Sequence, residues 1–176
     1  MKSQTMFKNA YADETIYKTD TATSNYANTE LYNWSGGTKT ILVNAAMVNT
    51  SYIRLPEATT ANPGLIVRII YALSPAALHH VGFVTSVIVG GAMTIGAATE
   101  GNAPTDAAMV SSAVGTANLR LDLDVNVAGK AGGHPGSMVE FFYTGVADVV
   151  ICKAVLHADV DDSTLANLFS TTAVNA

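Results

Sequence analysis

Apolar and polar residues alternate most strictly between positions 118 and 127. Leucine or valine stands at every odd position from 119 to 127. The polar positions between them are Arg120, Asp122, Asp124 and Asn126. A period of two places the two sets on opposite faces of a β-strand. The pattern therefore predicts one half-buried strand of an antiparallel sheet, with the arginine and the aspartates on an exposed polar face.

A second clear pattern lies between positions 51 and 71, where Tyr52–Leu55 and Leu65–Tyr71 are both β-rich runs. Between them stands Asn62-Pro63-Gly64. Proline fixes the φ angle that a turn needs at its first central position, and glycine accepts positive φ at the second. Pro56 cannot donate a ladder hydrogen bond, so the first run should end there or lie at a sheet edge. The stretch predicts a core hairpin or a corner of an all-β domain.

Other short β-rich runs fill most of the region from 38 to 157. They are Lys39–Val43, Val81–Val89 (one strand or two), Met93–Ile95, Met138–Thr144 and Val149–His157, the last two forming a hairpin. Residues 96–115 are predicted to be a long loop. Seven or eight short strands without alternating helices predict an all-β fold, an antiparallel β-sandwich or jelly-roll-like barrel. No internal repeat is evident.

Residues 1–37 differ from this region, because they are polar, show no sustained period and carry isolated aromatic rings. Disordered tails contain few aromatics, so these rings should be buried against something. The segment is either an extended N-terminal arm that docks on a neighbouring subunit or larger surface, or an irregular layer on its own domain. The β-sandwich domain then spans 38–157, and 158–176 form a C-terminal tail or short helix.

Composition favours assembly and argues against two classes of partner. Of the 176 residues, 13% are charged, against about 25% in a typical soluble domain. Copies of the chain or a partner would therefore cover much of the surface. The net charge of −5 and the scattered basic residues argue against nucleic acid. No apolar run resembles a signal peptide or a membrane span, so no membrane partner is predicted.

The four histidines do not have the spacing of a metal site. His79 and His80 are adjacent and should point to opposite faces of a strand. We interpret them, with His134 and His157, as loop and surface histidines. Asp159, Asp161 and Asp162 lack the glycine and distal glutamate of a calcium loop and are predicted to be a solvated acidic turn.

A catalytic constellation is also lacking at the sequence level. No GxSxG nucleophile motif occurs, and the single cysteine, Cys152, lies in an apolar run where it should pack as a small hydrophobe. The chain is therefore predicted not to be an enzyme and to use no cofactor or metal. A hydrolase that uses the acidic residues is the weakest alternative.

Two stretches of the chain form a further pattern. The first runs from Ile53-Arg54-Leu55-Pro56-Glu57-Ala58-Thr59 through Asn62-Pro63-Gly64-Leu65, and the second is Gly136-Ser137-Met138-Val139-Glu140-Phe141. Together they resemble small β-domains in virion proteins of tailed phages. The resemblance covers about residues 38–157. Many such domains have a tryptophan in the final strand, whereas this chain has Val149-Val150 there.

The resemblance implies a capsid decoration (cement) protein on the capsid exterior, which binds the outer surface and stabilises the head. Its partners would be the major capsid protein and itself, as a homotrimer. The aromatic anchors of the arm would be Phe7, Tyr11, Tyr17 and Trp34.

Two other functions stay open. A carbohydrate- or receptor-binding module of a phage fibre or tail appendage would need an exposed aromatic platform. A shell subunit is disfavoured because the arm is not basic.

Overall fold

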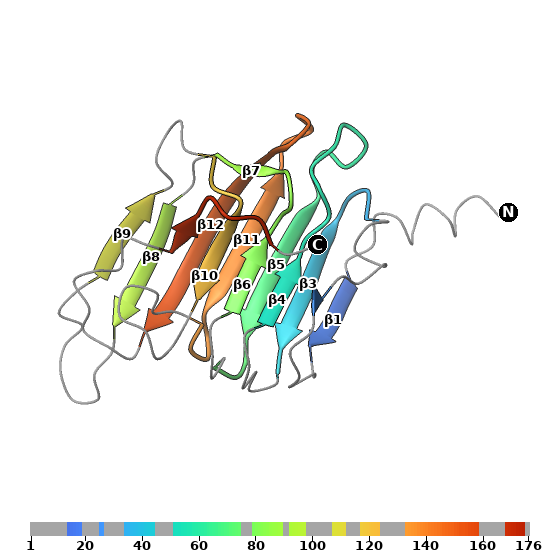
Figure 1. Ribbon diagram of the computed structural model, residues 1–176. Helices are drawn as coiled ribbons and strands as arrows, with labels where there is room; N and C mark the ends of the chain where they lie inside the picture. Colours follow the sequence, from blue (N-terminus) through green and yellow to red (C-terminus); the bar gives the residue numbers. More distant parts are fainter. Residues whose placement is uncertain are drawn as a thin grey trace, which may run out of the picture.

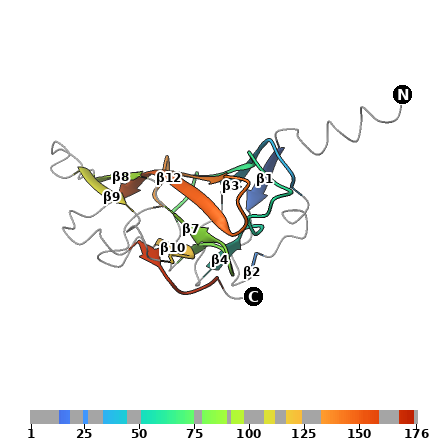
Figure 2. The same ribbon diagram turned by 90° about the horizontal axis from the view of Figure 1, so that it is seen from above.

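The computed structural model describes ten segments of the chain. They are residues 14–18, 25–26, 34–44, 51–74, 79–89, 92–97, 107–111, 117–123, 133–158 and 168–174. All regular structure in these segments is β-strand, and the strands form two sheets in two layers (Figures 1 and 2). Within them, no helix is long and apolar enough to cross a membrane. The prediction of an all-β sandwich is confirmed.

The large sheet has eight strands in the order β1-β3-β5-β11-β12-β8-β9, and β7 pairs with β12 beside β8. These are β1 (Glu14–Lys18), β3 (Thr38–Val43), β5 (Ile66–Tyr71), β7 (Val87–Ile88), β8 (Ala92–Ala97), β9 (Ala107–Ser111), β11 (Met138–Tyr143) and β12 (Val149–Ala158). The small sheet has five strands in the order β13-β10-β6-β4-β2. These are β2 (Asn25–Tyr26), β4 (Ser51–Arg54), β6 (His79–Gly82), β10 (Arg120–Leu123) and β13 (Phe169–Ser170).

The first six strands wind alternately between the two sheets. β1, β3 and β5 lie parallel in the large sheet, and β2, β4 and β6 lie parallel in the small one. Parallel neighbours need a long crossover connection, and here a strand of the opposite sheet is part of each crossover. Lys39 pairs with Val67 and Ser51 with His79, so the second and third turns are offset by 28 residues in both sheets. The first turn is slightly shorter, because Glu14 pairs with Lys39 and Asn25 with Tyr52. This structural repeat has no counterpart in the sequence pattern.

The remaining strands pair in both directions: β7 and β8 lie parallel to β12, and the other pairs are antiparallel. β11 joins β5 and β12, and β10 joins β6 and β13. Six of the eleven described pairings are parallel, so the predicted antiparallel pairing is corrected to two mixed sheets. A period-two pattern indicates a strand but not the direction of its neighbour, which is why the sequence did not indicate this.

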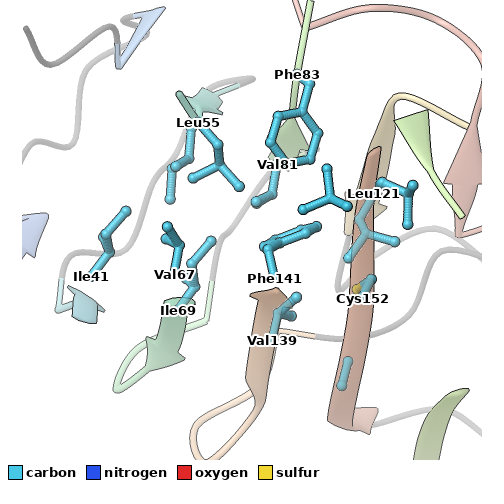
Figure 3. Packing of buried hydrophobic residues seen from close by; sticks show 14 of the residues in the cluster. Ile41, Leu55, Val67, Ile69, Val81, Phe83, Leu121, Val139, Phe141 and Cys152 are labelled. Atoms are coloured by element: carbon cyan, nitrogen blue, oxygen red, sulfur yellow. The ribbon is translucent and has the colours of Figure 1, made fainter. Parts of the chain in front are cut away.

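The core lies between the sheets. Every second residue of β3 and β5 is buried, because alternate side chains of a strand point inward. Figure 3 shows Val67, Val139 and Phe141 from the large sheet facing Val81 and Leu121 from the small one. Cys152 is fully buried in this cluster, which confirms that it packs as a small hydrophobe.

The segment around Asn62-Pro63-Gly64 is a corner and not a hairpin, because β4 and β5 belong to different sheets. The Leu65 amide donates to the Asn62 carbonyl at 3.4 Å, and Gly64 has φ +74°. Glycine accepts this backbone conformation at the second central position of a turn. The turn prediction is therefore confirmed.

Two other segments differ from expectation, and one open alternative is decided. The predicted loop 96–115 contains β9, which pairs with β8. Val81–Val89 contains two strands and not one, the end of β6 and the whole of β7, in different sheets. The C-terminal region contributes β13 to the small sheet. Positions 124–127 of the alternating strand lie outside the described residues.

Two pieces of the predicted N-terminal arm are strands of the sandwich itself. β1 pairs with β3, and β2 pairs with β4. Trp34, near the end of the segment, is also part of the hydrophobic core. The arm therefore contributes to the fold at each of these places.

Among the glycines of the described segments, Gly82 is predicted to be the least tolerant of substitution. A Cβ there would overlap the Leu119 carbonyl oxygen and lie 2.6 Å from the Arg120 Cα. Because the obstacle is backbone, Gly82→Ala should lower the free energy of unfolding by about 3 kcal/mol, as overpacking does. Gly64→Ala is the control, since its Cβ meets nothing within 4 Å and only the positive φ costs about 1 kcal/mol. Urea unfolding of both variants tests this, and equal losses would contradict it.

Candidate functional site: the outer face of the large sheet

The outer face of the large sheet is formed by residues of β3, β5, β11 and β12 that point away from the core. Strand registers arrange them in three rows. The first row is Ile151, Phe142, Ile66 and Thr38; the second is Lys153, Glu140, Arg68 and Thr40; the third is Val155, Met138, Ile70 and Leu42. Two largely apolar rows thus flank one charged row.

The apolar rows are exposed most strongly on β12. Ile151 is 40% exposed and Val155 is 41% exposed. Phe142, Met138 and Ile66 beside them are half-buried. Single exposed aliphatic residues are normal on protein surfaces, whereas a contiguous apolar patch marks an interaction site. The outer face is therefore the candidate interaction surface of this protein.

The charged row has one ion pair and one further cation. Arg68 Nε lies 2.7 Å and Nη2 lies 2.6 Å from Glu140 Oε1. Lys153 is exposed and makes no ion pair within the described part of the chain. The row as a whole carries a net positive charge between two apolar rows.

The sequence contains a signal for this face that the strand prediction did not use. The segments IVRIIY and MVEFFY are apolar on both parities, and VVICKAVLHA has Ile151 and Val155 among its outward residues. Near-continuous apolar runs are typical of strands covered on both faces. In this chain the core covers one face, and the other is the outer face.

A polar network fixes the loops at one end of the sandwich. The Glu57 carboxylate accepts backbone hydrogen bonds from Val84, Thr85 and Ser86, at 2.8, 3.2 and 2.7 Å. It also accepts from the hydroxyls of Thr85 and Ser86. Burial alone would raise the pKa of the Glu57 carboxyl, but the hydrogen bonds outweigh it and lower the pKa. The group is therefore a structural anion.

A shallow groove of about 340 Å³ lies beside this network. It is lined by Trp34, Ser35, Pro56, Glu57, Thr59, Ala61 and Asn62. Trp34 is only 6% exposed, so it offers little ring area to a ligand. The Lys39 ammonium lies 5.8 Å from the centre of its ring, a cation–π contact.

The four predicted anchors are not brought together by the described structure. Phe7 and Tyr11 lie outside the described residues. The backbone of Tyr17 lies in β1, and Trp34 lies in the core. Their binding role stays a prediction.

The prediction of loop and surface histidines is wrong for His79 and His80. Both lie in β6 and are buried. His79 makes an edge contact with Tyr71, and His80 stacks on Tyr52. The period of two correctly placed His79 and His80 on opposite faces of β6. Other side chains cover both faces of this strand, so both histidines are buried.

Asp122 is likewise buried and not on an exposed polar face. Its Oδ1 lies 2.6 Å from His80 Nδ1 and 2.7 Å from Arg120 Nε. Burial would raise the pKa of Asp122, but the hydrogen bonds and charges of His80 and Arg120 outweigh it and lower the pKa. Arg120 also donates to the carbonyl of Ala173, which links the C-terminal segment to β10.

The remaining candidate groups do not form a reactive cluster. Burial raises the pKa of the Cys152 thiol, which disfavours the thiolate nucleophile. His134 Nδ1 lies 3.3 Å from Ser74 Oγ. Among the described residues no three histidine, cysteine or carboxylate side chains gather as a metal site would need. Asp159, Asp161 and Asp162 lie outside those residues.

Comparison with protein-family models, with curated proteins and with solved structures finds no match to this chain.

The Glu57 network predicts a specific acid sensitivity. Because the folded-state pKa is lowered, its stabilisation is present above the usual glutamate pKa of about 4.3 and is lost as pH falls through the lower folded value. Glu57→Gln should lower the free energy of unfolding at pH 7 by about 1–3 kcal/mol. The reason is that an NH₂ group replaces one carboxylate oxygen and cannot accept the hydrogen bonds made to that oxygen. Below about pH 4.3, the free energy of unfolding should also fall less steeply in the variant than in the unaltered protein. Urea unfolding at pH 7 and at steps down to pH 3 measures both effects.

Asp148→Asn is the matched control. Asp148 is an exposed carboxylate with φ +59°, a conformation that asparagine also tolerates. Its removal should leave stability and acid sensitivity unchanged. Equal behaviour of the two variants would contradict the role given to Glu57.

Proposed function

We propose that this chain is a structural virion protein, a capsid decoration protein that binds the outer capsid surface and stabilises the head. The observation that carries the assembly part of the proposal is the outer face, where two largely apolar rows extend across four strands. The low charge of 13% agrees with a chain that covers its surface in an assembly. The capsid as partner rests on the resemblance to phage β-domains.

The proposed role is mechanical and not enzymatic. The best-bound carboxylates, Glu57 and Asp122, are held as acceptors of several hydrogen bonds within the fold. Apolar burial contributes about 25 cal/mol per Å² before the costs of association. On a shell, that contribution is repeated at every copy, so modest single contacts oppose the internal pressure of packaged genome.

In this proposal the capsid contact is made by the N-terminal segment ahead of β1. Phe7 and Tyr11 lie there, and aromatic residues are enriched among binding hot spots. Trp34 is left out of the contact because it is buried in the core. Self-association is assigned to the sandwich. The resemblance implies that three copies associate.

One observation favours a second candidate function, a receptor- or carbohydrate-binding module. The groove beside Trp34 combines a ring edge with polar side chains such as Ser35 and Asn62. Such sites are concave and contain a few placed polar groups. The small exposed area of Trp34 makes this the second choice. A glycan array with the intact chain tests it directly.

Removal of residues 1–13 is the test of the capsid contact. This truncation deletes Phe7 and Tyr11 but keeps β1, β2 and Trp34, which belong to the sheets and core. We expect the truncated chain to unfold at the same urea concentration and to lose at least tenfold in binding to empty phage heads. Co-sedimentation with heads from the phage that encodes the chain measures this binding.

The double variant Phe7→Ala/Tyr11→Ala separates aromatic contacts from mere chain length. It should lose binding as the truncation does. Full binding by both altered proteins would exclude the N-terminal contact. An intact chain that does not sediment with heads would overturn the decoration function.

A further inference from the structure

The outer face is complementary to itself. Its three rows place Ile151 beside Phe142, and Val155 beside Met138, on neighbouring strands β12 and β11. Between these pairs, the positive Lys153 lies beside the negative Glu140. The two strands therefore match one another, apolar against apolar and cation against anion, at three successive levels.

We propose that a second copy of this chain covers the outer face, related by a two-fold axis that runs along the strands between β11 and β12. The inference rests on the assembly role proposed above and names the occupant of the face. Rotation about such an axis keeps each residue at its level along the strand and exchanges β11 with β12. A β12 residue of one copy then lies over a β11 residue of the other copy. The two residues are the ones that pair with each other in the β11–β12 register of a single chain.

In this arrangement Lys153 of each copy lies over Glu140 of the other. The Lys153 ammonium, which makes no ion pair within the described part of the chain, then lies over the Arg68–Glu140 ion pair, in which the Glu140 side chain is 10% exposed. Ile151 and Val155, the most exposed residues of the face, lie over Phe142 and Met138. Face-to-face sheets pack with strands within about 30° of each other, which suits an axis along the strands.

Other two-fold arrangements of the same face fit less well. An axis along the charged row places Lys153 over Lys153, and an axis over β11 places Lys153 over Arg68. Like charges at such positions are repulsive. An axis between β5 and β11 places Arg68 over Glu140 but leaves Lys153 over Thr40, which has no charge to offer it. Charge complementarity therefore selects the axis between β11 and β12.

Sedimentation velocity of the intact chain over about 1–100 µM, a range chosen for contacts of moderate affinity, tests the two-fold contact. The chain has a mass of 18.3 kDa. We expect an even number of copies at high concentration, in place of the three copies that the resemblance implies. Lys153→Glu, which places a second carboxylate over Glu140, should raise the dissociation constant at least tenfold and halve the mass.

A second variant removes apolar contact without a charge change. Ile151→Thr/Val155→Thr keeps β-branched residues in β12, so the strand should still form. It too should raise the dissociation constant at least tenfold. The matched control is Val146→Thr, because Val146 is 58% exposed but lies in the turn between β11 and β12, away from the face. Urea unfolding of each variant verifies that it folds.

The outcomes separate this inference from the proposed function. An even assembly that halves with both variants and is unchanged in the control supports the two-fold contact. A monomer, an odd number of copies, or an assembly that the two folded variants leave intact would overturn it. A monomer that still sediments with heads would overturn the two-fold contact alone and leave the decoration function standing.

Discussion

Parallel strand pairing is the constraint on which this architecture depends. A strand that lies parallel to its neighbour must be reached by a return across the molecule, and in this chain the return includes a strand of the other sheet. The winding of β1 to β6 thereby builds both layers together and closes the core between them without a helix among the described residues. Each turn adds one strand to each sheet, which explains why the second and third turns have the same offset of 28 residues in both sheets.

The same winding determines where polar groups can be accommodated. Connections between layers cross the ends of the sandwich, and there the Glu57 carboxylate holds three consecutive amides of the segment before β7. Buried backbone donors need such partners. Apart from Lys39, the core face of the large sheet is largely apolar, and so is much of its outer face. The candidate interaction surface is therefore a sheet face and not a cleft.

Local chemistry was predictable from the sequence, and spatial neighbours were not. The turn at Asn62-Pro63-Gly64 and the hairpin of β11 and β12 follow from turn residues and short β-rich runs. Alternation also placed Asp122 on the face of the small sheet away from the core, but not beneath neighbours such as His80 and Arg120. Strand direction and the outer face were missed, because a period of two does not indicate which strand lies alongside.

The outer face of the large sheet is covered when copies of the chain associate, and the reactivity of the Lys153 amine measures this covering directly. Amine acetylation followed by mass spectrometry can compare Lys153 with the buried Lys39 in dilute and concentrated protein. The account predicts that Lys153 reacts readily when dilute and becomes protected as concentration rises, while Lys39 stays unreactive in both. Equal labelling of Lys153 at every concentration would contradict a covered outer face.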